Sequence, residues 1–363
     1  MKKIRESNFE LMRIISMFLI IIWHILIHGN VINNCVNPGV KVFLEISMFF
    51  ILIHVNSFVI LTGYFQSVSS FKKDKLIKLV IQVITYSSVI TLIGLKMGWN
   101  GDFRRITILN SFLPSVLGNY WFIVAYLIVY VFSDYINKFI HSLSKPDYKK
   151  LLFIGFGIFS VMPYISGMKL LYNDGYNFYS FIYLYMVGGY LRMYPLKESY
   201  HFKHMSIKKY RYVIIFLFIV CGLLNYFVND FAYKIAGFNE FYSEIANRIF
   251  GTHLIYSSPF AIIQSVCFFE LFKTINIRSK LINFVSSTAF GIYLLHDNII
   301  IKNNLYSLLG LKNSIFVSFK TIPYVIFIAL VIFIACSFIE IIRKKIENIV
   351  LYFIKKIKLR RLT

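Results

Sequence analysis

The sequence LMRIISMFLIIIWHILIHG, residues 11–29, is long and apolar enough to cross a lipid bilayer as one helix. It nevertheless contains Arg13, His24 and His28. A charged side chain at the middle of a bilayer costs about 2.5–3.5 kcal/mol on insertion scales, and such residues usually face a protein interior or water. We therefore expect these three side chains to have partners inside a helical bundle or to serve a function there.

Apolar runs of this kind recur along the whole chain. Hydrophobic residues make up 58% of its 363 residues and charged residues only 15%, whereas about a quarter of a soluble domain is charged. The sequence thus predicts an all-α, polytopic membrane protein in which residues 1–342 form a single transmembrane domain and residues 343–363 a basic cytoplasmic tail. About ten spans are expected, at residues 11–28, 43–64, 76–95, 120–137, 151–168, 177–194, 212–229, 252–272, 284–301 and 321–342.

The net charge of +23 is explained by topology. With the N-terminus inside, 28 Lys and Arg residues fall in cytoplasmic segments and 10 in outer ones, which favours an N-in, C-in arrangement by the positive-inside rule. We therefore expect lipid and no nucleic acid as a partner of these charges. The abundance of Lys, Ile, Asn, Phe and Tyr is typical of an AT-rich bacterial genome, so the expected location is a bacterial plasma membrane. The four cysteines lack the spacing of a metal site, and no metal is expected.

The first helix carries one polar line, formed by Glu10, Arg13, His24 and His28. Arg13 and His24 are eleven residues apart, and eleven steps of about 100° return to nearly the same face of a helix. In the expected topology Arg13 lies near the cytoplasm, where it suits a phosphorylated ligand. His24 lies deeper, where a neutral imidazole can take a proton from a hydroxyl. Alternatively, Arg13 pairs with Glu10 and His24 hydrogen-bonds a neighbouring helix.

Other polar residues inside expected spans are candidate supporting residues. His54 and Asn56 lie in the middle of the second span, and His296 and Asp297 near the outer end of the ninth. In the expected topology His296 and Asp297 share the depth of His24, and an aspartate can orient an imidazole. A His–Asp pair near the interface is equally compatible with a structural role.

The first cytoplasmic loop is rich in lysine. Its sequence SFKKDKLIKL contains Lys72, Lys73, Lys75 and Lys78 close to the expected inner end of the first helix. These side chains suit the phosphates of a nucleotide-containing donor, although they also suffice to set topology. Lys73, Lys75 and Lys78, together with Arg13, are the candidate donor-phosphate ligands.

Four segments resemble the acyltransferase family 3 membrane proteins. Arg13 and His24 match the Arg-x10-His pattern of that family's first helix, and VNSFVILTGYF (55–65) is similar to its second-helix segment. YWFIVAYLIVY (120–130) and FGIYLLHDN (290–298) resemble its fourth helix and a late Tyr-Leu-x-His segment. They occur in the expected order and cover nearly the whole chain.

The resemblance implies transfer of an acyl group, usually acetyl, from cytoplasmic acyl-CoA to a sugar hydroxyl of a surface or lipid-linked glycan. It implies that His24 is catalytic, as the general base, and that Arg13 handles the donor. Acyl-CoA would be a co-substrate, with no permanently bound cofactor, and glycan-synthesis proteins would be partners. Where the family often has Arg-x2-Arg, this chain has Lys75-x2-Lys78, which keeps the charge but loses the bidentate fork of arginine. The alternative is a polysaccharide transporter or export component of the same fold.

Overall fold

The computed structural model describes residues 6–99, 120–166, 177–236 and 256–360, and its regular elements there are helices without a strand. The helices are α1 (Ser7–His28), α2 (Pro38–Ile51), α3 (Ile53–Gln66), α4 (Lys73–Lys96), α6 (Trp121–Val131), α7 (Ser133–Ser142), α8 (Lys145–Phe156), a π-helix (Gly157–Val161), α9 (Met162–Ser166), α11 (Phe178–Met193), α12 (Ile207–Ala236), α14 (Pro259–Lys273), α15 (Lys280–Ser286), α16 (Ala289–His296), α17 (Ile299–Leu308) and α18 (Thr321–Arg360), with short 3-10 turns at Leu196–Glu198 and Leu311–Asn313.

The all-helical membrane fold is confirmed in outline. In the described residues five helices are long and apolar enough to cross a membrane, or up to seven if two bent pairs each count as one span. Each of the ten expected spans overlaps a helix, but α11 and α14 have only 16 and 15 residues, fewer than the roughly 20 that a full span needs. The number ten and the N-in orientation stay predictions.

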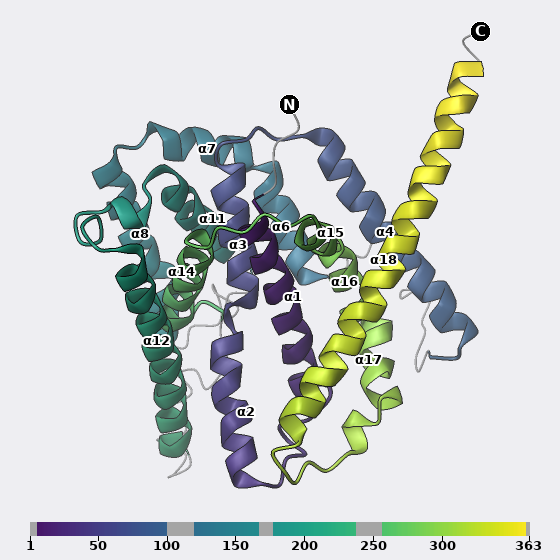
Figure 1. Cartoon of the computed structure of the whole chain (residues 1–363), viewed down its shortest axis with the longest axis horizontal. Coiled ribbons are helices and arrows are strands. Elements are labelled where there is room, and N and C mark those ends of the chain that lie inside the picture. The colour runs from purple at the N-terminus through teal and green to yellow at the C-terminus, as the bar shows by residue number, and fades with distance from the viewer. Residues whose placement is uncertain (1–5, 100–119, 167–176, 237–255, 361–363) are drawn as a thin grey trace.

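The first helix occupies the middle of the bundle (Figure 1). α1 packs against α3 and α14 on one side and against α15, α16 and α18 on the other. This position explains how a helix with a polar line is tolerated in a membrane, because its polar side chains meet other helices instead of lipid.

The neighbouring pair α3 and α11 owes its close approach to two glycines. A Cβ added at Gly63 would collide with the backbone carbonyl of Tyr185, and one at Gly188 with the carbonyl of Ile60. Small residues at such crossings let helix backbones meet and increase van der Waals packing, which is the main attraction between helices in lipid. The two glycines thereby fix the position of α3 beside α11.

Two of the expected spans are sharply bent and are not straight helices. The span at 120–137 is divided into α6 and α7, bent by 56°, and the span at 284–301 ends in a bend of 84° between α16 and α17. The second break has a local cause, since the Asn298 side chain accepts a hydrogen bond from the backbone N–H of Ile300 at 3.0 Å and so begins a new helix. Asp297 therefore lies at a corner between two helices.

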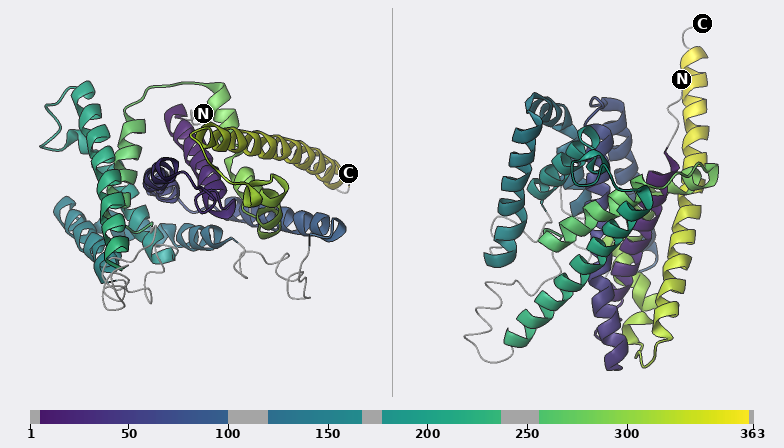
Figure 2. Two further views of the ribbon diagram at one scale, coloured as in Figure 1. Left: turned by 90° about the horizontal axis from the view of Figure 1, so that it is seen from below. Right: turned by 60° about the vertical axis from the view of Figure 1, so that its left-hand side comes forward.

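The last helix is much longer than a membrane span. α18 has 40 residues, or about 60 Å at 1.5 Å per residue, and it continues without a break past residue 343, where the tail was expected to begin. The start of α1 and the end of α18 lie at the same end of the bundle (Figures 1 and 2), as two termini on one side require.

Candidate active site

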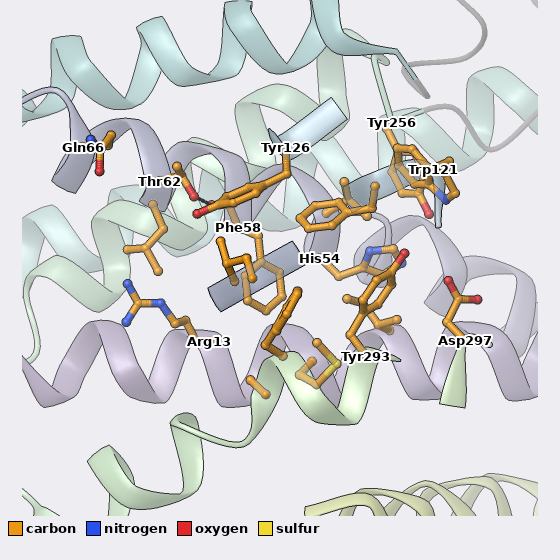
Figure 3. Close-up of a pocket in the computed structure, with 18 of the residues that line it drawn as sticks. Arg13, His54, Phe58, Thr62, Gln66, Trp121, Tyr126, Tyr256, Tyr293 and Asp297 are labelled. Carbon is orange, nitrogen blue, oxygen red and sulfur yellow. Dashed lines mark hydrogen bonds between the residues drawn. The ribbon is translucent and has the colours of Figure 1, made fainter. Parts of the chain in front are cut away.

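A cavity of about 320 Å³ lies beside α1, with walls from α1, α3, α4, α6 and α16 and from Tyr256 just before α14 (Figure 3). Its walls are mostly apolar and aromatic, with a few polar side chains, as is usual for a small-molecule pocket. The lining residues are Arg13, Met17, Ile20, His24, His54, Val55, Phe58, Leu61, Thr62, Phe65, Gln66, Lys75, Leu79, Trp121, Phe122, Tyr126, Tyr256, Ala289, Phe290, Tyr293 and Asp297.

Arg13 and His24 both line this cavity, about 16 Å apart along α1 at 1.5 Å per residue. Figure 3 shows Arg13 at one end of the cavity and Asp297, which faces His24, at the other. The cavity thus follows the length of the polar line. We call the two ends the Arg13 end and the His24 end.

At the Arg13 end the guanidinium is held in place. Arg13 Nη1 donates to Glu10 Oε1 at 2.6 Å, and Glu10 Oε2 accepts a hydrogen bond from Ser286 of α15 at 2.5 Å. The guanidinium carbon also lies 5.7 Å from the ring centre of Phe65. The Arg13–Glu10 pair expected as an alternative is therefore present, and it positions Arg13 at the cavity wall.

The candidate lysines differ in their placement. Lys75 lines the cavity at the Arg13 end, with its Nζ 4.7 Å from the ring centre of Tyr130. All four loop lysines are exposed to some extent, Lys75 included, but Lys72, Lys73 and Lys78 do not line the described cavity. Of the loop lysines, Lys75 alone shares the cavity with Arg13 among the described residues.

At the His24 end the imidazole faces a carboxylate. His24 Nε2 lies 3.8 Å from Asp297 Oδ1, and Lys302 Nζ of α17 lies 3.2 Å from the same oxygen. His24 Nδ1 has no hydrogen-bond partner in the described part of the chain. A separation of 3.8 Å is too long for a hydrogen bond but short enough to stabilise a positive charge on the ring.

The other expected histidines of this region surround His24 without lining the cavity. The ring centres of His28 and His296 each lie 5.1 Å from that of His24. His296 is fully buried, and its Nδ1 lies 2.6 Å from the carbonyl of Ile292 in its own helix. Their contacts support the position of the His24 ring.

His54 and Asn56 of α3 have different surroundings. His54 lines the cavity, and its ring centre lies 5.5 Å from that of Trp23 and 5.4 Å from that of Tyr256. Asn56 lies outside the cavity, and its Nδ2 donates to the backbone carbonyl of Tyr256 at 2.8 Å. Asn56 therefore holds Tyr256 in the cavity wall.

Comparison with known families agrees with this geometry. The model of acyltransferase family 3, described as "Acyltransferase domain", matches residues 6–341. The chain belongs to this family. No curated protein and no solved structure matched the chain. Family membership establishes a multi-pass membrane acyltransferase in general terms.

Several lining residues of the acyltransferase had no role in the sequence-based prediction. Trp121 and Tyr256 stack at the His24 end, with ring centres 6.0 Å apart and planes inclined by 24°. Tyr256 belongs to none of the recognised motifs, so no sequence signal indicated it. The hydroxyls of Thr62 and Tyr126 are hydrogen-bonded at the cavity wall (Figure 3). Tyr126 lies in the segment 120–130 that resembles the fourth helix of the family, but the resemblance gives it no role.

Tyr130 and Asp134 follow Tyr126 at intervals of four residues along α6 and α7, and both have a structural role. Tyr130 accepts a hydrogen bond from the backbone N–H of Lys72 at 3.2 Å, and Asp134 accepts one from Phe71 at 2.7 Å. Both fix the loop before α4 and with it the position of Lys75. In the described part of the acyltransferase, no group of three or more His, Cys, Asp or Glu side chains is arranged to hold a metal ion.

Proposed function

We propose that this protein is an O-acyltransferase that moves an acyl group, in the simplest case acetyl, from cytoplasmic acyl-CoA to a hydroxyl of a surface or lipid-linked glycan. The observation that carries the proposal is that one cavity holds cationic side chains, Arg13 and Lys75, at one end and His24 beside Asp297 at the other. The two ends separate the binding of an anionic donor from a base.

The donor binds at the Arg13 end. Arg13 and Lys75 attract its phosphates, and Arg13 keeps guanidinium N–H groups beyond the one given to Glu10. The pantetheine arm follows the apolar wall formed by residues such as Met17, Ile20 and Phe58. The thioester then reaches His24, about 16 Å further along α1.

At the His24 end the imidazole acts as general base. It removes the proton of the acceptor hydroxyl as the oxygen attacks the thioester carbon, and the carboxylate of Asp297 stabilises the imidazolium that forms. When the tetrahedral intermediate collapses, the carbon–sulfur bond breaks and the thiolate leaves. The imidazolium returns the proton to sulfur, so the products are the ester and free CoA.

The acceptor enters beside Trp121 and Tyr256. Aromatic side chains combine a large apolar face with a polar edge, which suits the apolar face and hydroxyls of a sugar ring. We expect such an enzyme to act in a bacterial plasma membrane, with glycan-synthesis proteins as the partners that deliver the glycan.

The test uses the full chain in proteoliposomes with acetyl-labelled CoA and a glycan extract as acceptor. Wild type is expected to release CoA and label the glycan, while His24→Gln loses about 10²–10⁴-fold in rate, which is the usual contribution of general-base catalysis. His141→Gln, at an exposed histidine of α7, serves as the matched control. Absence of CoA release by wild type would overturn the proposal in favour of transport.

A further inference from the structure

His54 is a cavity residue for which the reaction above has no use. Its side chain is 1% exposed, and neither ring nitrogen has a hydrogen-bond partner among the described residues. Buried polar groups are nearly always hydrogen-bonded, so an exception calls for a reason. Because His54 lines the cavity, a molecule bound there can supply the missing partner.

The ring of His54 is held in one orientation. Trp23 packs against it edge to face, with an interplanar angle of 83°, and Tyr256 packs at 60°. Tyr256 is itself fixed by the hydrogen bond from Asn56 to its carbonyl. A polar group whose position is set before the substrate binds can stabilise developing charge without reorganisation.

His54 also lies close to the reacting end of the cavity. Trp23, which touches its ring, is the residue directly before His24 in α1, and the two histidines are near enough to interact electrostatically. Figure 3 shows His54 in the same half of the cavity as Tyr293 and Asp297.

The surroundings assign different roles to the two histidines. His24 has the carboxylate of Asp297 at 3.8 Å, which stabilises the ring once it has taken up a proton. His54 has no such carboxylate among the described residues, so it lacks the support that a base needs. An imidazole always carries at least one N–H donor, and His54 has this donor unused.

We propose that His54 donates a hydrogen bond to the carbonyl oxygen of the bound thioester and stabilises the oxyanion of the tetrahedral intermediate. The inference rests on the proposed acyl transfer. As the acceptor oxygen bonds to the carbonyl carbon, the C=O electron pair moves to oxygen, and the His54 N–H holds that charge. His24 takes the hydroxyl proton in the same step, and both roles end when the thiolate leaves.

The first measurement compares His54→Phe, His54→Gln and wild type in the proteoliposome assay. Phe keeps an aromatic ring for Trp23 and Tyr256 but lacks an N–H, whereas Gln keeps a donor. Loss of one oxyanion donor costs about 10²–10³-fold in kcat, so we expect this loss in His54→Phe with KM within about threefold, and partial recovery in His54→Gln.

The second measurement distinguishes oxyanion binding from a structural role. An acyl dithioester of CoA replaces the carbonyl oxygen by sulfur, which is a weak hydrogen-bond acceptor. Wild type is expected to react much faster with the thioester than with the dithioester. In His54→Phe this ratio of rates, measured on the remaining activity, should be at least about tenfold smaller. Melting temperatures of the variants in detergent report whether they are folded.

The outcomes separate this inference from the proposed function. If wild type transfers acyl groups and His24→Gln does not, but His54→Phe keeps the full rate, the role of His54 is refuted while the function stands. The role of His54 is likewise refuted if His54→Phe reacts more slowly with the thioester and with the dithioester by the same factor, so that the ratio of the two rates is unchanged. If wild type transfers no acyl group at all, the function and this inference fall together.

Discussion

Two buried carboxylates lie at α16, and their surroundings differ: Glu340 packs against this helix, and Asp297 directly follows its last residue. Glu340 of α18, 1% exposed, accepts hydrogen bonds from Tyr86 at 2.5 Å and from Arg343 at 2.7 and 2.9 Å, with Gln82 at 3.3 Å. Its carboxylate packs against Gly291 of α16, where a Cβ would collide with it. Asp297, at the end of the same helix, has Lys302 at 3.2 Å and His24 at 3.8 Å.

The difference separates a carboxylate that holds helices together from one that faces the cavity. The Glu340 carboxylate accepts four hydrogen bonds of 2.5–3.3 Å from α4 and α18, which leaves no acceptor site for a ligand. Asp297 lines the cavity, and the 3.8 Å between its carboxylate and His24 Nε2 leaves room for the imidazole to move. A buried charge alone does not indicate a functional site. A buried charged group that lines a cavity and lacks some of its hydrogen bonds does.

The largest effect is expected on stability, from Glu340→Gln. Removing the charge leaves Glu347, at 2.8 Å, as the one carboxylate partner of Arg343 among the described residues. Breaking a buried ion pair costs about 3–5 kcal/mol, of which we expect the lower end. The melting temperature in detergent should fall clearly, while activity per folded molecule changes less than about twofold. Glu347→Gln, at a half-exposed partner of the same arginine, is the control and should cost less than about 1 kcal/mol. Equal effects of the two variants would contradict the comparison.

A smaller effect, on rate instead of stability, is expected from Asp297→Asn. The amide keeps the size of the side chain but no longer stabilises an imidazolium at His24, so kcat should fall about 10²-fold, within the range of a general acid–base contribution. The measurement is label transfer in proteoliposomes alongside a melting curve, which should shift little. A large fall in melting temperature with a normal rate would mean that Asp297, like Glu340, holds helices together and has no part in the reaction.

The smallest effect is expected at the Arg13 end. Lys75 lines the cavity and Lys73 does not, although both belong to the first turn of α4. Lys75→Met should raise the KM for acyl-CoA about twofold to fivefold, in line with the 0.2–1 kcal/mol of an exposed ion pair, with kcat unchanged. Lys73→Met should leave both constants unaltered. A rise of KM in both variants would mean that the loop attracts the donor by its total charge.

Much of the fold and part of the site follow from local sequence. Apolar runs locate the helices because each span must satisfy its own backbone hydrogen bonds in lipid. Helical periodicity placed Arg13 and His24 on one face, and both line one cavity. Their chemical roles stay predictions.

The remaining features depend on contacts between distant segments. The break at Asp297 comes from one asparagine cap within an apolar run, which a span search reads as continuous. Lys302 meets Asp297 only because α17 turns back by 84°. Tyr256 reaches the cavity because Asn56, 200 residues away in sequence, holds its carbonyl. No periodicity within a single helix contains such information.

One helix carries both Arg13 and His24, so the ten residues between them set a length. An insertion of a single residue there would rotate one side chain about 100° away from the other and lengthen their separation by only about 1.5 Å. In the proposed reaction, this spacing fixes the length of the carrier arm that presents its thioester at the imidazole. The helix α1 could accept a shorter or longer arm only by losing or gaining whole turns.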